Sequence, residues 1–310
     1  MYDLIIVGGG PAGLAAGIYA MRARLEALLI EHAEPGGQML LSPDVDNYPG
    51  IPSIRGGELA KRMKKHAEGL GLSIQLDGIG QVRKEGDVFI ASGQEQEYRA
   101  RSVVVATGEV PRKLGAAGEE ELSGRGVSYC ATCDGFFFAD KDVLVVGGGD
   151  SALAEALYLS GIARKVYIAH RRDEFRGNRL YQERVLSKPN IEVLWSTVVE
   201  KIVGKEVEGL MGEQIVSAVL LRSTPSSATR ELPIDGVFMA VGNTPITQMV
   251  DCEKDERGYI ITDERMQTSV AGMFAAGDCR KKGLRQICTA TSDGAVAATE
   301  AGEYLLRSSR

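Results

Sequence analysis

Residues 3–13 read Asp3-Leu4-Ile5-Ile6-Val7-Gly8-Gly9-Gly10-Pro11-Ala12-Gly13, a short apolar run followed by a cluster of glycines. The pattern is that of a buried strand that passes through a glycine turn into a helix. The first glycine permits the tight turn, the second lets the backbone approach a pyrophosphate, and the third lets helix and strand pack closely. The helix N-terminus then offers free N–H groups and a positive dipole to the phosphates, so the stretch predicts a dinucleotide-binding unit.

The same design occurs again 139 positions later, as Asp142-Val143-Leu144-Val145-Val146-Gly147-Gly148-Gly149-Asp150-Ser151-Ala152. The offset extends beyond the glycines, because Tyr19 corresponds to Tyr158 and Leu29 to Ile168. One glycine-rich turn is weak evidence and has a purely structural alternative, but two in register favour nucleotide binding. The repeat predicts an α/β protein with two Rossmann-like dinucleotide-binding domains. The predicted loop residues are Gly8, Gly10, Pro11, Ala12 and Gly13 in the first copy and Gly147, Gly149, Asp150 and Ser151 in the second.

The residue that ends the second strand of each unit distinguishes the two ligands. In the first unit it is Glu31, whose carboxylate would accept hydrogen bonds from ribose hydroxyls. In the second it is His170, followed by Arg171, Arg172 and Arg176, and guanidinium groups bind a 2′-phosphate bidentately. The alternative for these residues is a solvated run of charges. Their position favours FAD in the first unit and NADPH in the second.

A pair of cysteines, Cys130 and Cys133, lies just ahead of the second glycine loop. Two cysteines at this spacing can form a small exchangeable disulfide, and a neighbouring nicotinamide site favours redox chemistry. Zinc sites use the same spacing, but zinc would need a second Cys or His pair, and the other cysteines show none. An inert pair is the remaining alternative. Cys252, Cys279 and Cys288 are expected to be buried or idle.

Composition limits the class of protein further. The 38 glycines among 310 residues exceed the average usage of about 7% and fit a fold with many close backbone–cofactor approaches. The formal net charge of −6 argues against a nucleic-acid partner. There is no run of eighteen apolar residues and no signal-peptide pattern, so neither a membrane span nor secretion is expected. The odd number of cysteines fits a reducing cytoplasm.

The repeat also predicts the domain organisation. Residues 1–112 and 244–310 are expected to form a discontinuous FAD-binding domain, and residues 115–241 an inserted NADPH-binding domain with the cysteine pair. Near the C-terminus, residues 272–278 predict a short buried strand that ends at a carboxylate, and residues 286–306 predict a long helix. Candidate hinges lie near residues 111–118 and 242–245, which are rich in Gly or Pro.

With these motifs in view, the chain resembles the low-molecular-weight thioredoxin reductases over essentially its full length. The resemblance implies a homodimer that binds FAD, takes hydride from NADPH and reduces the disulfide of thioredoxin. It rests on the two glycine loops, on residues 35–38, 47–50, 106–108, 126–135, 170–176 and 276–278, and on Arg285-Gln286. Asp150 and Gly177 depart from the usual pattern of the second unit.

The resemblance also implies roles for individual residues. Asp278 and Gln286 would contact FAD, with Gln38 and Asn47 lining the flavin site. The matching motifs add Gly37, Ala106, Thr107, Gly108, Gly277 and Arg285 to the FAD set. Arg125, Phe136 and Phe137 would form part of the thioredoxin-docking face, although three consecutive aromatics at 136–138 are more often core. Cys133 would be the sulfur nearer to the flavin. Asp134 is positioned for general acid/base catalysis, with a helix N-cap as the alternative.

Competing functions predict other features. A ferredoxin-linked relative would lack the basic cluster, a peroxiredoxin-reducing one would carry an additional N-terminal disulfide region, and a ferredoxin–NADP reductase would lack the cysteine pair. Reduction of another small disulfide protein by the same mechanism remains an alternative. A different class of function is an FAD- and NADPH-binding redox sensor without turnover.

Overall fold

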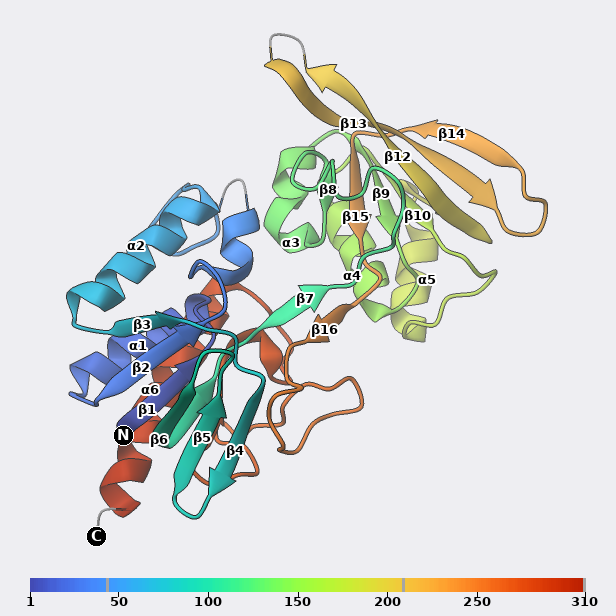
Figure 1. Cartoon of the computed structure of the whole chain (residues 1–310). Coiled ribbons are helices and arrows are strands. Elements are labelled where there is room, and N and C mark those ends of the chain that lie inside the picture. The colour runs from blue at the N-terminus through green and yellow to red at the C-terminus, as the bar shows by residue number, and fades with distance from the viewer. Residues whose placement is uncertain (43–44, 208–209, 309–310) are drawn as a thin grey trace. The chain divides into compact units, whose positions relative to one another are not determined.

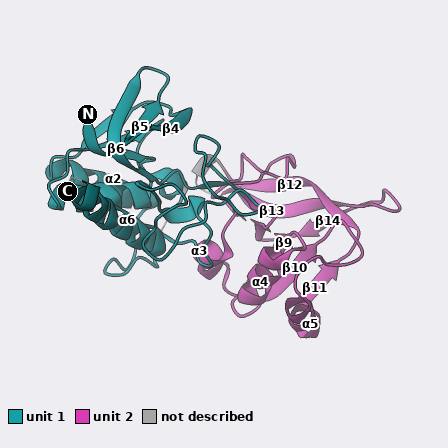
Figure 2. Cartoon of the chain, turned by 90° about the horizontal axis from the view of Figure 1, so that it is seen from below, with its two compact units in different colours: residues 1–110, 244–310 teal, residues 111–243 magenta. Residues whose placement is uncertain are grey.

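The chain divides into two units, one inserted into the other. A computed structural model describes residues 1–42, 45–207 and 210–308. The first unit comprises Met1–Val110 and Thr244–Arg310, and the second comprises Pro111–Asn243 (Figure 2). Both contain a mainly parallel sheet with helices, which confirms the predicted α/β class with an inserted second domain.

The sheet of the first unit has the order β3-β2-β1-β6-β5-β4, with β17 paired to β6 (Figure 1). Its strands are β1 Tyr2–Val7, β2 Ala27–Glu31, β3 Ser73–Leu76, β4 Gln81–Glu85, β5 Val88–Ser92, β6 Glu97–Val105 and β17 Met273–Ala275. Strands β3, β2, β1, β6 and β17 run parallel, whereas β4, β5 and the start of β6 are antiparallel. The parallel strands β1 and β2 are apolar and almost wholly buried, as expected when helices cover the sheet.

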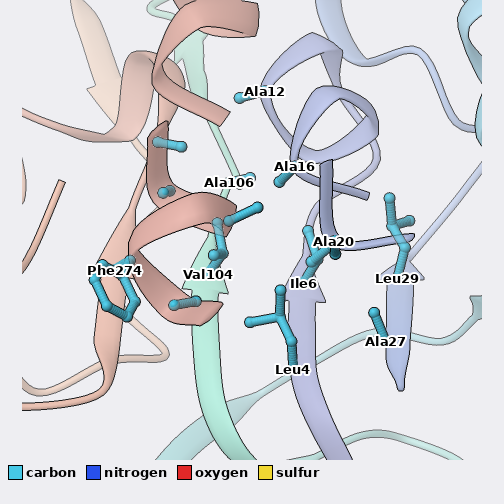
Figure 3. Packing of buried hydrophobic residues seen from close by; sticks show 14 of the residues in the cluster. Leu4, Ile6, Ala12, Ala16, Ala20, Ala27, Leu29, Val104, Ala106 and Phe274 are labelled. Carbon is cyan, nitrogen blue, oxygen red and sulfur yellow. The ribbon is translucent and has the colours of Figure 1, made fainter. Parts of the chain in front are cut away.

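The described part of the first unit has the helices α1 Pro11–Arg22, α2 Gly56–Gly69 and α6 Ile287–Ser308. The short 3₁₀ helices η1 Gly37–Leu41 and η3 Gly277–Cys279 precede α2 and α6. Figure 3 shows Ala12, Ala16 and Ala20 of α1 directed into the core beside the sheet residues Ile6 and Val104. Small side chains on this face bring α1 close to the sheet and to α6, and so fix the start of α1 beside the strand ends.

The second unit repeats this plan. Its parallel strands β8 Val127–Ser128, β9 Asp142–Val146, β10 Lys165–Ala169, β11 Ile191–Leu194 and β15 Gly236–Met239 have the order β11-β10-β9-β15-β8. This order corresponds to β3-β2-β1-β6-β17 of the first unit. The helices are α3 Ala131–Asp134, α4 Asp150–Leu159 and α5 Arg179–Ser187, with the 3₁₀ helix η2 Gly135–Phe138. The internal repeat in the sequence is therefore a repeat of structure.

The described residues form two further sheets. Strands β12 Thr197–Val207, β13 Leu210–Ser223 and β14 Thr229–Pro233 form an antiparallel sheet in the second unit. Strands β7 Glu109–Pro111 and β16 Asn243–Pro245 pair with each other where the chain passes between the units. Within the described residues, none of the helices has both the length and the apolar character that a membrane span requires.

Candidate active site and cofactor sites

The first glycine loop connects β1 to α1 with very little space. A Cβ on Gly13 would lie 1.8 Å from the carbonyl oxygen of Gly8, and one on Gly8 would lie 2.4 Å from that of Ala106. Gly8 also has a φ of +106°, which side chains disfavour. Pro11 occupies the first turn of α1, where no N–H is required. The loop thus presents bare backbone at the start of a helix, as a pyrophosphate site requires.

Glu31 lies at the end of β2 and is buried beside this loop. Its Oε2 accepts a hydrogen bond from the N–H of Gly9 at 2.6 Å, and its Oε1 accepts one from the N–H of His32 at 2.8 Å. The imidazole Nδ1 of His32 lies 2.5 Å from the same Oε1. These contacts fix the carboxylate at the edge of the glycine loop, the position predicted for a ribose contact.

Other predicted FAD residues gather around the start of α1. The N–H of Gly36 donates to the carbonyl oxygen of Gly9 at 2.9 Å, which brings Gly37 against Gly10. Gly277 packs against Ala12, the second residue of α1. Residues from three distant parts of the sequence therefore meet at one helix N-terminus.

Asp278 provides a test of whether a cofactor fits here. Its Oδ1 is buried and has no hydrogen-bond partner, and the nearest cation, Nζ of Lys282, lies 3.8 Å away. Burial raises the pKa of Asp278 to about 6, an effect that the charge of Lys282 opposes. A buried acceptor without a donor is rare in folded proteins, and a ligand hydroxyl would satisfy it. The site therefore fits a cofactor that offers hydroxyl donors.

Asp293, within α6, holds the loop that carries Asp278. Its carboxylate accepts hydrogen bonds from the N–H of Gly277 at 3.1 Å, from Nε of Arg280 at 2.9 Å and from Nζ of Lys282 at 2.7 Å. Burial alone would raise the pKa of Asp293, but the bonds from Arg280 and Lys282 outweigh it and hold the pKa below 3.8. Sequence reasoning missed Asp293, because an aspartate within a helix carries no local signal that two buried cations will contact it.

Arg285 is held by a second buried carboxylate, that of Glu109. Nε of Arg285 forms an ion pair with Oε2 of Glu109 at 3.0 Å, at an angle that makes no hydrogen bond. The hydroxyl of Tyr259 donates to the same oxygen at 2.7 Å, and the guanidinium lies 4.4 Å from the Tyr259 ring centroid. Burial and Glu109 raise the pKa of Tyr259 to about 12. The carbonyl oxygen of Glu109 accepts a bond from Gln38, so this unpredicted residue contacts two predicted ones.

The remaining FAD candidates are also fixed in the first unit. Thr107 donates its hydroxyl to the carbonyl oxygen of Ile246, and the N–H of Ile246 donates to the carbonyl oxygen of Gly108 at 3.0 Å. Asn47 and Gln286 form a hydrogen bond with each other.

The second glycine loop has the same geometry as the first. A Cβ on Gly147 would lie 2.5 Å from the carbonyl oxygen of Ala240, which corresponds to the Gly8–Ala106 approach. Gly149 has open space around it, and Ser151 is exposed in the first turn of α4. Ala152 takes the place of Gly13 and is fully buried. This loop therefore also presents backbone at a helix start.

The basic residues after β10 divide into a buried one and exposed ones. His170 is buried against Gly148, and its Nε2 lies 3.0 Å from the carbonyl oxygen of Glu174. Burial lowers the pKa of His170, so the ring is neutral at pH 7. Arg171, Arg172 and Arg176 are exposed, and none forms an ion pair with another residue of the described ranges. The three guanidinium groups are thus available to an anion, whereas His170 supports the loop beneath them.

Cys130 and Cys133 are bonded to each other as a disulfide in the second unit. Cys130 precedes the four-residue helix α3, and both cysteines are half-buried. Asp134 ends that helix and stands at the N-cap position of η2, where its side chain makes no capping hydrogen bond, so its carboxylate does not act as a capping group. Residues 1–42, 45–207 and 210–308 contain no group of three His, Cys, Asp or Glu side chains placed to hold a metal ion.

The aromatic residues after the disulfide do not behave alike. Phe136 and Phe137 are 68% and 41% exposed, with their rings 6.2 Å apart edge to face. Phe138 is buried against Phe238, at 5.2 Å between centroids. The core interpretation thus holds only for the third residue. Arg125 is exposed as well, and it donates to the carbonyl oxygen of Glu121.

One further buried carboxylate, Glu119, organises the segment before the disulfide. It accepts hydrogen bonds from the N–H groups of Leu114 and Gly115, at 3.0 and 2.7 Å, and from the hydroxyl of Tyr129 at 3.0 Å. Tyr129 directly precedes Cys130. Glu119 therefore ties the Gly-rich segment, which the sequence marks as a candidate hinge, to the residue next to the redox pair.

The sequence of residues 2–294 matches the family described as pyridine nucleotide-disulphide oxidoreductase, and the chain belongs to this family. Its relatives narrow the class further. The chain is 48% identical over 306 residues to the thioredoxin reductase of Treponema pallidum, and the aligned residues cover 98% of this chain and 97% of that protein. It is 45% identical over 307 residues to that of Listeria innocua, covering 98% and 94%. The crystal structure of thioredoxin reductase from Streptococcus pyogenes matches with a TM-score of 0.93 at 42% identity, over 99% of each chain.

Proposed function

We propose that this protein is a thioredoxin reductase, an NADPH-dependent flavoprotein that reduces the disulfide of thioredoxin through FAD and the Cys130–Cys133 pair. The observation that carries the proposal is that disulfide, which lies in the same unit as the second glycine loop. The similarity to thioredoxin reductases along almost the full chain supports it.

FAD is the cofactor that we assign to the first unit. The orphaned Oδ1 of Asp278, the fixed carboxylate of Glu31 and the bare backbone at Gly8 and Gly13 suit an adenosine diphosphate with additional hydroxyls. Asn47, Gln286 and Arg285 would orient its other end. When bound, FAD and NADPH would supply the hydride chemistry that brings two electrons to the disulfide.

NADPH, rather than NADH, is the reductant that we assign to the second unit. The exposed guanidinium groups of Arg171, Arg172 and Arg176 have no carboxylate partner in the described structure, so an anionic ligand does not have to displace one. Each charge-assisted bond to a 2′-phosphate contributes roughly 1.5–3 kcal/mol, which NADH cannot gain.

The cysteine pair transfers the electrons by thiol–disulfide exchange. Once reduced, the Cys130 thiolate attacks one sulfur of the thioredoxin disulfide and forms a mixed disulfide, while the other thioredoxin sulfur leaves as a thiolate. Asp134 supplies the proton that this thiolate takes up. Cys133 then gives its proton to the Asp134 carboxylate and attacks Sγ of Cys130 as a thiolate. The second thioredoxin sulfur leaves as a thiolate and takes up that proton, and the Cys130–Cys133 disulfide re-forms.

Docking and motion complete the proposal. The exposed rings of Phe136 and Phe137 offer thioredoxin an apolar patch, and the family resemblance adds the cation of Arg125 to the docking face. Residues 115–241 would rotate about the two connections near 112–118 and 241–245, because the same cysteines must be reduced in one position and reach a bulky protein in another.

By the family resemblance, the active form is a homodimer. The three free cysteines support a reducing, cytoplasmic location.

The experiment is a steady-state assay of NADPH oxidation by the purified yellow protein with a panel of small disulfide proteins. Oxidation that depends on thioredoxin supports the proposal. Turnover with another small disulfide protein alone would assign a different substrate to the same chemistry. A protein that binds FAD and NADPH but oxidises NADPH with none of the panel would be a sensor, and a colourless protein that takes up no flavin would overturn the proposal.

A further inference from the structure

The loop that carries the basic residues is bonded directly to the second glycine loop. We call residues 170–178 the arginine loop. The N–H of Arg176 donates to the carbonyl oxygen of Gly148 at 2.9 Å. Two residues further on, the N–H of Asn178 donates to Oδ1 of Asp150 at 2.6 Å. One oxygen of the exposed Asp150 carboxylate, at the first residue of α4, is therefore bonded to the arginine loop.

Gly177 lies between these two bonds. Because it has no side chain, the arginine loop can lie close to the second glycine loop. Gly177 is buried, and a Cβ on it would lie 2.6 Å from Cδ1 of Leu153 and 3.1 Å from the backbone of Gly149 and Asp150. A side chain at this position would push the arginine loop away from the glycine loop. Asp150 and Gly177 thus belong to one feature of the structure.

Asn178 extends the connection to the next helix. Its Oδ1 accepts a hydrogen bond from the N–H of Leu180 at 2.8 Å and so caps α5. Gln182, in the first turn of α5, donates its side-chain amide to the carbonyl oxygen of Gly177 at 2.7 Å. The bond to Asp150 therefore fixes the start of α5 against the start of α4, with the end of the arginine loop between them.

The other end of the arginine loop is held by the turn between β11 and β12 and by the first residue of β12. The N–H of Ser196 donates to the carbonyl oxygen of Arg172 at 2.9 Å, and the N–H of Thr197 donates to that of His170 at 2.9 Å. The buried ring of Phe175 packs on Trp195, with 4.4 Å between ring centroids. The backbone of the loop is thus held at both ends and in the middle, while its arginine side chains are exposed.

We propose that Asp150 is a positioning residue for the 2′-phosphate of NADPH, and this inference rests on the proposed function. Its bond to Asn178 holds the arginine loop over the glycine loop before any ligand binds. The guanidinium groups then need not be ordered on binding, which is a cost that weakens flexible sites. One oxygen of the Asp150 carboxylate is already bonded to the N–H of Asn178. Asp150 thereby supports discrimination between NADPH and NADH without contacting the group that distinguishes them.

The test compares two ligands that differ only in the 2′-phosphate, adenosine 2′,5′-bisphosphate and adenosine 5′-monophosphate, by calorimetric titration of the flavin-loaded protein. Asp150→Ala removes the acceptor, and the preference for the bisphosphate should fall five- to tenfold. Asp150→Asn keeps an acceptor oxygen and should restore most of the preference. Gly177→Ala disrupts the same contact between the two loops, because the added methyl group clashes with Leu153. It should lower the preference for the bisphosphate as Asp150→Ala does.

Asp173→Ala is the matched control, because it removes a carboxylate from the same loop but leaves the contact with the glycine loop intact. The preference of the Asp173→Ala protein for the bisphosphate should stay within twofold of the wild-type preference, or rise above it. An Asp150→Ala protein with the wild-type preference, or an Asp150→Asn protein as impaired as Asp150→Ala, would overturn the inference. A wild-type protein that binds both nucleotides equally would instead overturn the assignment of NADPH.

Discussion

The side-chain amide of Asn47 donates a hydrogen bond to Oε1 of Gln286 at 3.1 Å, although 239 positions separate the two residues. One precedes α2 and the other directly precedes α6, so the bond joins two segments that meet only in the folded first unit. Both residues belong to the predicted flavin set. Each side chain therefore restricts the orientation of the other at the place where FAD is expected.

This pair yields a prediction about flavin affinity. Asn47→Ala and Gln286→Ala should each raise the dissociation constant of FAD, because the partner side chain loses its fixed orientation. A net hydrogen bond contributes about 0.5–1.5 kcal/mol, so the coupling between the two positions should amount to a factor of about 2–13. Titration of the flavin-free single and double variants by flavin fluorescence measures it. Effects that simply add would mean that the two residues act independently.

The glycine loop gives a second prediction, with a control from the same unit. Gly13→Ala would place a Cβ 1.8 Å from the carbonyl oxygen of Gly8, so β1 and α1 must separate. Overpacking of this kind costs about 1–3 kcal/mol, and we expect bound flavin to be lost as well. Gly57→Ala on α2, with open space around its Cβ, should keep both stability and flavin. Thermal unfolding and the flavin-to-protein absorbance ratio check both variants, and a stable yellow Gly13→Ala protein would contradict the expectation.

Much of the fold was predictable because local patterns determine it. Leu29 and Ile168, matched by the repeat, are both fully buried in their strands, while Tyr19 and Tyr158 are both exposed on their helices. Such correspondence follows from periodicity and from the glycine turns, which require only neighbours in sequence. The helix expected at 286–306 is α6, Ile287–Ser308.

What the sequence did not predict depends on partners far apart in the chain. The carboxylate of Glu109 meets Tyr259 and Arg285, and neither residue carries a local signal of that contact. The bond from Asn178 to Asp150 is of the same kind. His170 was grouped with its basic neighbours by sequence, but burial against Gly148 gives it a different environment from theirs. Tertiary contacts, rather than residue type, decide these cases.

The three phenylalanines after the disulfide give a third prediction. Phe136→Ala should raise the KM for thioredoxin about tenfold and leave the melting temperature unchanged, because the ring is 68% exposed and packs little in the free protein. Phe138→Ala should instead lower the free energy of unfolding by about 3–5 kcal/mol, since that ring is buried against Phe238. Thioredoxin kinetics and chemical denaturation separate the two effects. A Phe136→Ala protein with an unchanged KM would place the docking surface elsewhere.

Asp293 gives a prediction about pH. Because its folded pKa lies below 3.8, the ionised carboxylate stabilises the fold above the unfolded pKa, and this stabilisation is lost as the pH falls through the folded value. Asp293→Asn removes the charge between Arg280 and Lys282 and should cost about 3–5 kcal/mol at pH 7. The difference from the wild type should shrink below pH 4. Denaturant unfolding at pH 7, 5, 4 and 3 measures it, and an equal difference at pH 7 and pH 3 would show that the charge is not the cause.

The last prediction separates the roles of the two cysteines. Either Cys130→Ser or Cys133→Ser should abolish thioredoxin reduction, because neither variant can re-form the disulfide that links them. Reduction of bound flavin by NADPH should survive in both, because the cofactor residues are untouched.

The two cysteine variants should differ in one respect. With Cys133→Ser, the remaining Cys130 thiol has no partner to resolve a mixed disulfide, so a covalent adduct with thioredoxin should accumulate. Cys130→Ser should form far less of this adduct. Cys288→Ser, which alters a free cysteine on α6, is the control and should turn over normally. Non-reducing electrophoresis and stopped-flow flavin absorbance give both readouts. An adduct formed mainly by the Cys130→Ser protein would reverse the assignment of the attacking sulfur.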